Sequence, residues 1–263
     1  MLRFCSLYSG STGNCLLVQD DQTKILVDAG VSGKKVVEAL ASLQIDMSQI
    51  SAILVTHEHN DHIKSIGTLS KKYNIPVFAN QETWQAMPKE KSKIALDNQH
   101  IYIPYEVFDI HSLKIGAFQV PHDAANPCGF CIKSGDKKIS IATDLGHITP
   151  QIMRCLKNSS FLLLESNYDP EVLRCSKYPY ALKTRINGPK GHLPNYLAGQ
   201  ILSQLVDSGL QSAMLGHLSK ENNFPELAYQ TVMNELIQNH YKENSINLSV
   251  ASRNEPSKLI EIS

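Results

Sequence analysis

The sequence lacks the features of a secreted, membrane-spanning or disordered protein. Nowhere do 18 apolar residues follow one another, and the opening MLRFCSLYSG has no apolar run long enough for a signal peptide. No repeat, low-complexity tract or Pro/Ser-rich linker interrupts the 263 residues. Because 42% of the residues are hydrophobic, the chain can bury a sizeable core. These features predict a single cytoplasmic domain over residues 1–263, without membrane contact.

The sequence also lacks an excess of charge and a disulfide framework. Twenty-five basic residues balance 25 acidic ones, so any contact with nucleic acid needs a local basic patch. The six cysteines are expected to be reduced thiols in the cytosol. Cys128 and Cys131 have the Cys-x-x-Cys spacing of a zinc or redox site, but we expect them in a strand, where positions three apart face opposite sides. No protein partner can be inferred.

Apolar patterning predicts an α/β protein. Strands are expected at 2–8, 15–18, 24–30, 52–56 and 76–79, and helices at 34–43, 63–73 and 81–87. Residues 99–143 are expected to be mostly β, and the last third to hold strands 161–166 and 212–217, helices 195–206 and 225–238, and a polar stretch between. Mixed β regions followed by helices, twice over, predict two packed sheets with helices on both outer faces. This is an αββα four-layer sandwich.

The stretch THEHNDH, residues 56–62, concentrates metal-binding side chains. His57 and Glu58 begin the helical zinc-protease pattern His-Glu-x-x-His, but the position four after His57 is Asp61, and the histidine comes one later, at His62. In a helix, His57 and His59 would lie about 200° apart and could not share an ion. We therefore expect a loop whose remaining ligands come from elsewhere, with Glu58 pointing outward.

Polar groups follow one apolar strand after another. AILVT leads into His57, AFQVP into His122, ISIAT into Asp144, FLLLE ends in Glu165, and AMLG leads into His217. The carboxyl ends of neighbouring parallel strands meet at one edge of a sheet, where α/β proteins place their ligands. We expect these side chains to converge there. Asp28, which follows the apolar residues of ILVDAG, is expected to hydrogen-bond the metal loop rather than bind a metal.

The donors are too many for one tetrahedral ion and predict two divalent ions. We expect His57, His59 and His122 on one ion, Asp61, His62 and His217 on the other, and Asp144 bridging both. Imidazole and carboxylate suit Zn, Mn, Fe or Ni, and of these we expect Zn or Mn.

These residues carry a family resemblance. THEHNDH with His122, Asp144 and His217 resembles the metallo-β-lactamase superfamily, whose fold is the αββα sandwich. SLYSGSTGN, THEHNDHIKSIG, YPYALKTRINGPKGHLPN and GHLSKENN further resemble the bacterial YycJ/WalJ group, described as metal-dependent 5′ to 3′ exonucleases on double-stranded DNA. The flavodiiron oxygen reductases of this superfamily typically carry glutamate at the position of His59. Histidine there favours hydrolysis over redox chemistry.

The residues after Asp144 suggest how a phosphodiester is handled. The order of Glu165, His192 and His217 is similar to that in tRNA 3′-processing phosphodiesterases, where a carboxylate and histidine pair assists the leaving oxygen. We expect Glu165 to orient His192, which protonates the leaving group or holds the phosphate. Asp61 is expected to orient the attacking hydroxide. Lys183 and Arg185 are candidates for binding the phosphate backbone, with a solvated surface as the alternative.

One position departs from the YycJ/WalJ pattern, because Pro194 stands where serine is expected. No room exists between Glu165 and His217 for the inserted domain of the β-CASP nucleases. Two alternative functions stay open: a metallo-hydrolase of small substrates such as a lactone, thioester or cyclic phosphodiester, and a non-catalytic nucleic-acid-binding or regulatory protein.

Overall fold

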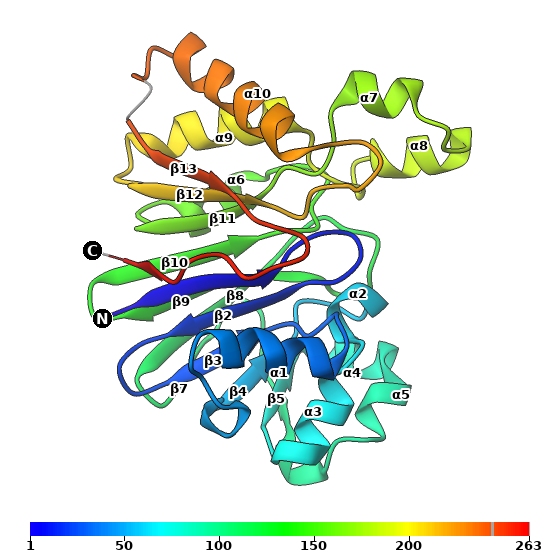
Figure 1. Ribbon diagram of the computed structural model, residues 1–263, viewed down its shortest axis with the longest axis vertical. Coiled ribbons are helices and arrows are strands. Elements are labelled where there is room, and N and C mark those ends of the chain that lie inside the picture. Colours follow the sequence, from blue (N-terminus) through cyan, green and yellow to red (C-terminus); the bar gives the residue numbers. More distant parts are fainter. Residues whose placement is uncertain (243–244, 263) are drawn as a thin grey trace. The chain divides into compact units, whose positions relative to one another are not determined.

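The computed structural model describes residues 1–242 and 245–262. Its strands form two seven-stranded sheets (Figure 1). The chain divides into two compact units. The first comprises Met1–Gln119, Ala124–Lys137 and the C-terminal residues from Ser252, and the second comprises Val120–Asp123 and Lys138–Ala251. The expectation of a single domain over 1–263 stays a prediction.

The first sheet lies wholly in the first unit, in the order β14-β1-β2-β3-β4-β5-β6. Its strands are β1 (Arg3–Tyr8), β2 (Cys15–Gln19), β3 (Lys24–Val27), β4 (Ala52–Leu54), β5 (Val77–Ala79), β6 (Gln99–Ile101) and β14 (Ile260–Glu261). Pairing is antiparallel from β14 to β3 and parallel from β3 to β6. The carboxyl ends of β3 and β4, which precede Asp28 and His57, therefore share one sheet edge.

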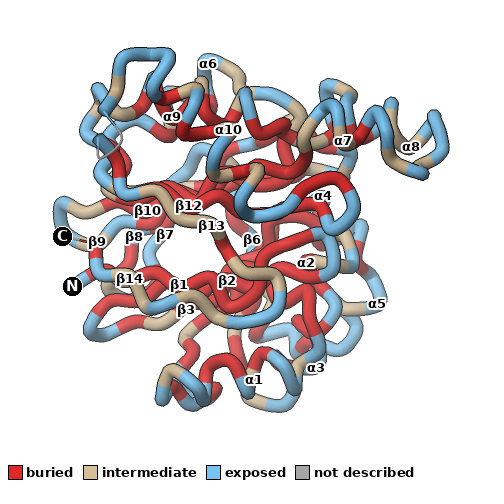
Figure 2. Tube along the Cα trace, turned by 45° about the horizontal axis from the view of Figure 1, so that its top comes forward, coloured by how far each residue is buried: buried red, intermediate tan, exposed pale blue. Residues whose placement is uncertain are grey.

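Helices cover one face of this sheet. They are α1 (Gly33–Ser42), the single turn α2 (Asn60–Ile63), α3 (Ile66–Tyr73), α4 (Gln81–Ala86) and α5 (Pro88–Lys91), with 3₁₀ turns at Met47–Gln49 and Leu96–Asn98. In α1 the Ser32 side chain caps the first turn. Val36, Ala39 and Leu40 follow the i, i+3, i+4 spacing of one helix face and are buried in the core formed with the sheet (Figure 2). Burying a side chain such as Leu40 stabilises the fold by about 1.5–3 kcal/mol.

The other face of the first sheet packs against β7 (Val107–Ile110), β8 (Leu113–Gln119) and β9 (Cys128–Ser134), which pair antiparallel. The Tyr102 hydroxyl donates to the Val55 carbonyl at 2.9 Å, while its ring lies edge-on to Phe130 of β9, 5.4 Å between centroids. At the opposite end, the Asp20 carboxylate accepts from the Ser112 hydroxyl at 2.8 Å. The first unit is thus layered as helices, sheet and sheet.

The second unit contains four parallel strands in the order β13-β12-β11-β10. They are β10 (Lys137–Ala142), β11 (Phe161–Glu165), β12 (Ser212–Gly216) and β13 (Asn247–Val250). The connections contain α6 (Pro150–Leu156), α7 (Pro170–Cys175), α8 (Tyr180–Ile186), α9 (Asn195–Val206) and α10 (Pro225–Gln238). Glycine lets α9 and α10 approach closely, because a Cβ on Gly199 would lie 2.5 Å from the Glu235 Cβ.

Most predicted elements are confirmed, and helices 195–206 and 225–238 have the expected bounds. Cys128 and Cys131 lie on β9, the first buried and the second partly exposed, as expected for strand cysteines. The single helix predicted at 63–73 is wrong: it breaks at Ser65, whose backbone is not helical and whose hydroxyl donates to the Ala29 carbonyl. The polar stretch after β11 contains α7 and α8, which were not predicted.

Candidate metal centre

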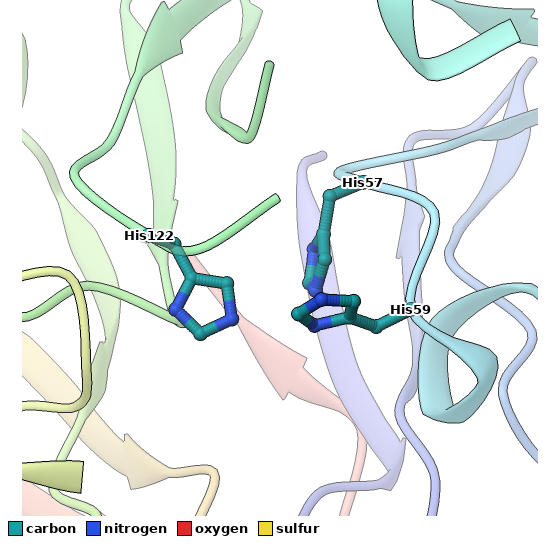
Figure 3. A group of neighbouring side chains, drawn as sticks. All are labelled: His57, His59 and His122. Carbon is teal, nitrogen blue, oxygen red and sulfur yellow. The ribbon is translucent and has the colours of Figure 1, made fainter. Parts of the chain in front are cut away.

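The first unit carries four of the predicted ligands just beyond β4. His57 and His59 lie on a loop, and Asp61 and His62 lie in the helical turn α2, which begins after His59. The prediction that the whole stretch is a loop is therefore wrong from residue 60 onward. The ring centroids of His57 and His59 are 4.6 Å apart and those of His57 and His62 are 4.1 Å apart. Figure 3 shows His57 and His59 projecting from the same loop with their rings close together.

Buried acceptors fix the tautomers of these histidines. His62 Nδ1 donates to Asp28 Oδ2 at 2.7 Å. The Thr56 hydroxyl donates to the same oxygen at 2.8 Å and lies 3.0 Å from His57 Nδ1, from which it can accept. A proton on Nδ1 leaves the lone pair on Nε2, the form in which imidazole binds a metal ion. The expectation that Asp28 supports the metal loop through hydrogen bonds is confirmed.

The N-terminal turn SGSTGN braces the same loop. Asn14 Nδ2 lies 3.0 Å from His62 Nε2, a contact that a metal ion bound at Nε2 would replace. The backbone N–H of Asn14 donates to the Asp61 carbonyl at 2.8 Å. Gly30 packs directly on this carbonyl, since a Cβ there would lie 1.5 Å from the Asp61 oxygen. Only glycine fits at position 30.

The second unit gathers the other predicted residues at the carboxyl ends of its strands. Ligand atoms of Asp144, Glu165, His192 and His217 all lie within 4.8 Å of one another. Asp144 and His217 follow β10 and β12 in the left-handed backbone conformation, with φ of 56° and 54°. Non-glycine residues seldom adopt it, and where they do they cluster at functional sites. The convergence predicted from the strand endings is confirmed for these residues.

Glu165 is the centre of this cluster. It is fully buried, and its Oε1 accepts from Nδ1 of His192 at 2.8 Å and from Nδ1 of His217 at 2.7 Å. Its Oε2 accepts from the backbone N–H groups of Leu145 and Leu193. Burial alone would raise the Glu165 pKa, but the two histidines lower it well below its ordinary value. The carboxylate stays ionised and holds both rings with Nε2 as the lone-pair nitrogen.

His122 follows β8 and belongs to the second unit. Its Nδ1 donates to the Gly191 carbonyl at 3.1 Å, so its Nε2 also carries the lone pair. Burial lowers the pKa of His122, and the nearby Asp144 carboxylate only partly opposes this. The ring is therefore neutral near pH 7, as a metal ligand must be.

The two predicted phosphate-binding cations already have protein partners. Lys183 Nζ donates to the carbonyls of Arg174 and Ser176, each at 2.7 Å, which ties α8 to the end of α7. Arg185 Nε donates to Asp123 Oδ2 at 2.5 Å and remains exposed. Both lie on the helix α8 rather than on the expected loop.

Three supporting residues had no assigned role in the sequence. Asn14 and Thr56 contact the histidines directly, and Asn167 donates to the His217 carbonyl at 2.7 Å. Glu58 also has a role, since its Oε1 accepts from the backbone N–H of Ala125 at 2.8 Å and fixes the metal loop. The sequence offered a signal only for Thr56 and Glu58, which stand on either side of His57.

The donor set of each unit suits divalent metal ions. The imidazoles of His57, His62, His122 and His217 have Nδ1 against a protein acceptor, which leaves Nε2 for a metal ion. Together with the carboxylates they form a donor set that binds Zn and similar ions. None of the helices within residues 1–242 and 245–262 is long and apolar enough to cross a membrane.

Several known proteins resemble this chain in sequence or in fold. The beta-lactamase superfamily domain matches residues 23–218. The chain is 38% identical over 231 residues to the Bacillus anthracis protein named exodeoxyribonuclease YycJ, with 88% of each chain covered. It is 37% identical over 238 residues to exodeoxyribonuclease WalJ of Streptococcus pneumoniae, covering 90% of this chain and 88% of that one. The metallo-beta-lactamase fold protein YhfI of Bacillus subtilis shares the fold at 14% identity, with a TM-score of 0.71 and 98% and 100% of the two chains covered.

The protein is a metal-dependent hydrolase of the metallo-β-lactamase fold, as its two mixed sheets, its outer helices and the histidines and carboxylates at its strand ends indicate. The predicted four-layer α/β class is confirmed. The chain belongs to the beta-lactamase superfamily and, within it, to the family of YycJ and WalJ.

Proposed function

We propose that the protein is a dinuclear metal-dependent phosphodiesterase that degrades double-stranded DNA from an end in the 5′ to 3′ direction. The observation that carries this proposal is the Glu165–His192 pair, held beside ligand-type donors in a chain whose relatives are named exodeoxyribonucleases. A thioester hydrolase has less need of such a pair, because a thiolate leaves with less help from protonation than the sugar oxygen of a phosphodiester. A lactone expels an alkoxide and would also benefit from the pair, so the names of the relatives favour DNA over a lactone. DNA is accordingly the proposed partner, and the cytoplasm the proposed location.

We assign the ligands as the strand endings predict. His57, His59 and His122 would hold one ion and Asp61, His62 and His217 the other, with Asp144 as a ligand of both. When bound, the ions supply a nucleophile at neutral pH and positive charge for the phosphate oxygens. Zn or Mn are the proposed metals, with Fe or Ni as alternatives.

The catalytic work of the chain falls to three side chains. Asp61 accepts a hydrogen bond from the attacking water and orients it toward phosphorus. His192 is one-fifth exposed, so Nε2 can reach the leaving oxygen while Nδ1 stays bonded to Glu165. The buried Glu165 carboxylate holds the Nδ1 proton and would stabilise the imidazolium that forms when Nε2 takes up a proton from solvent. His192 then gives that Nε2 proton to the leaving oxygen and returns to the neutral ring.

The basic residues of α8 are proposed to contact the DNA backbone. Arg185 is exposed, so its guanidinium can reach a phosphate of a bound strand while Nε pairs with Asp123. Lys183 uses donors on two carbonyls, so we expect its main contribution to be the position of α8.

The deciding experiment offers linear duplex DNA, labelled at one 5′ end, beside a lactone and a thioester, each with Mn and with Zn. We expect DNA to be shortened from its 5′ end and the small esters to react slowly or not at all. Asp144→Ala should abolish cleavage of every substrate and lower the metal content. Rapid turnover of a small ester with intact DNA would identify a small-molecule hydrolase, and metal binding without any turnover would identify a non-catalytic protein.

A further inference from the structure

The helices α7 and α8 line an open pocket that the proposed chemistry does not use. Figures 1 and 2 show both helices extending beyond α9 and α10 of the same unit. The cavity between them measures about 640 Å³, within the range of pockets that hold small organic ligands. Tyr168, Arg174, Tyr180, Lys183 and Asn187 contribute to its lining.

The cavity is built on the two segments that carry the catalytic pair. Tyr168 comes three residues after Glu165, and Gly188 comes four before His192. Four residues span at most about 14 Å, so the cavity wall lies within about four nucleotide steps of His192. The segments are also joined to each other, because the backbone N–H of Asn195 donates to the Tyr168 carbonyl at 3.0 Å. A ligand in the cavity would therefore be positioned relative to the catalytic pair.

The charged groups of the cavity are already paired. Arg174 donates through Nε and a terminal nitrogen to the Glu171 carboxylate, at 2.9 and 2.6 Å. Lys183 donates to two carbonyls, as described above. With Glu171 opposing the two cations, the lining carries a net charge of about +1, which is little for a phosphate chain. The cavity suits a largely neutral ligand better.

Its remaining features suit a planar, hydrogen-bonding ring. Tyr180 is 85% exposed, so its ring contributes little to the folded core and is available for stacking. The Tyr168 hydroxyl donates to Asn187 Oδ1 at 2.6 Å, which fixes the orientation of that amide. Within residues 1–242 and 245–262, the amide NH₂ group of Asn187 has no hydrogen-bond partner. An aromatic face and an oriented amide donor are the groups that bind an unpaired nucleobase.

We propose that this cavity is a nucleobase subsite, in which an unpaired base near the end of the substrate strand stacks on Tyr180 and accepts a hydrogen bond from Asn187. The inference rests on the proposed function. It adds that the enzyme separates the end of the duplex and takes hold of one base. Lys183 is then the residue that holds the two walls of the subsite together.

The test uses duplexes that carry a single abasic tetrahydrofuran residue at each of the first four positions of the degraded strand. Rates of single-turnover cleavage are compared for the wild type, Tyr180→Ala and Tyr180→Phe. Wild type should cleave one of the four substrates about 5- to 150-fold more slowly than intact DNA, because the stacking of one base is lost. Tyr180→Ala should show a similar loss on intact DNA and no further loss at that abasic position, whereas Tyr180→Phe keeps the ring and should behave as wild type.

Two controls separate the possible outcomes. Tyr105→Ala removes another exposed tyrosine, 46% accessible and in the first unit, and should leave the abasic profile unchanged. A small chromogenic phosphodiester, which cannot reach the subsite, should be cleaved equally by wild type and Tyr180→Ala. Equal cleavage of all abasic substrates by the wild type, or an unchanged profile in Tyr180→Ala, would overturn the subsite while leaving the exonuclease intact. Failure of the wild type to cleave any DNA would overturn both proposals.

Discussion

Replacing Glu165 by glutamine tests how the hydrogen bonds of this carboxylate hold together the cluster of Asp144, Glu165, His192 and His217. The carboxylate accepts four hydrogen bonds, two from the histidines at Oε1 and two from backbone N–H groups at Oε2. Glutamine offers one acceptor oxygen and one NH₂ group, so two of the four donors would face another donor. Each buried donor left unsatisfied costs about 1–3 kcal/mol, and Glu165→Gln should lower the free energy of unfolding by about 2–6 kcal/mol. That is a large share of the roughly 5–15 kcal/mol typical of a folded protein.

The histidines could reduce this loss of stability by changing tautomer, but metal binding would then be weakened. If Nδ1 of His192 and His217 accepts from the new amide, the proton moves to Nε2, and His217 can no longer bind a metal through that atom. Urea unfolding in the presence of a chelator would measure the stability, and a Zn or Mn titration would measure the metal affinity. Glu58→Gln is the matched control, because Glu58 accepts a single backbone bond that glutamine can keep. A Glu165→Gln protein with unchanged stability and unchanged metal affinity would refute the reasoning.

Four further results are expected. His192→Ala should slow cleavage of a phosphodiester about 10²- to 10⁴-fold without changing the metal content, and an unchanged rate would remove the acid role. Arg185→Gln should lower the slope of log affinity for duplex DNA against log salt by about 1 if the guanidinium contacts a phosphate, and an unaltered slope would indicate a solvated surface. Gly30→Ala should disrupt metal binding, because the new Cβ would displace the Asp61 carbonyl; calorimetric metal titration equal to that of wild type would contradict this. Folding lowers the Glu165 pKa from its ordinary value of 4.5, so the ionised carboxylate should stabilise the fold fully above pH 4.5 and progressively less below it. The urea midpoint of the metal-free wild type should therefore fall with acidity more steeply than that of Glu165→Gln.

The strand endings could be predicted from sequence because they combine two local signals. An apolar run such as FLLLE identifies a buried strand, and the polar residue at its end must face a sheet edge. This argument correctly brought Asp144, Glu165 and His217 together. The helix α9 was equally predictable, because its apolar residues repeat with helical spacing over twelve positions.

The short helices and the supporting hydrogen bonds could not be found in this way. The helices α7 and α8 have six and seven residues, too few for a periodic apolar face, and only the Asp169–Pro170 start of α7 is a local signal. Asn14 and His62 are 48 positions apart, so nothing in the sequence near either residue indicates their contact. Such pairs depend on how the turns are placed by the sheet.

The acceptors behind the histidines explain why these rings suit both metal binding and acid catalysis. Asp28, Gly191 and Glu165 each hold a proton on Nδ1 of a different histidine and thereby reserve Nε2 for the reaction side. Glu165 does this for two rings with a single oxygen. When His192 takes up a proton, its bond to that oxygen strengthens, and the oxygen becomes a weaker acceptor for His217. Electron density at the Nε2 of His217 therefore depends on the charge of His192, which would link the proposed metal ligand to the proposed acid without any movement of the backbone.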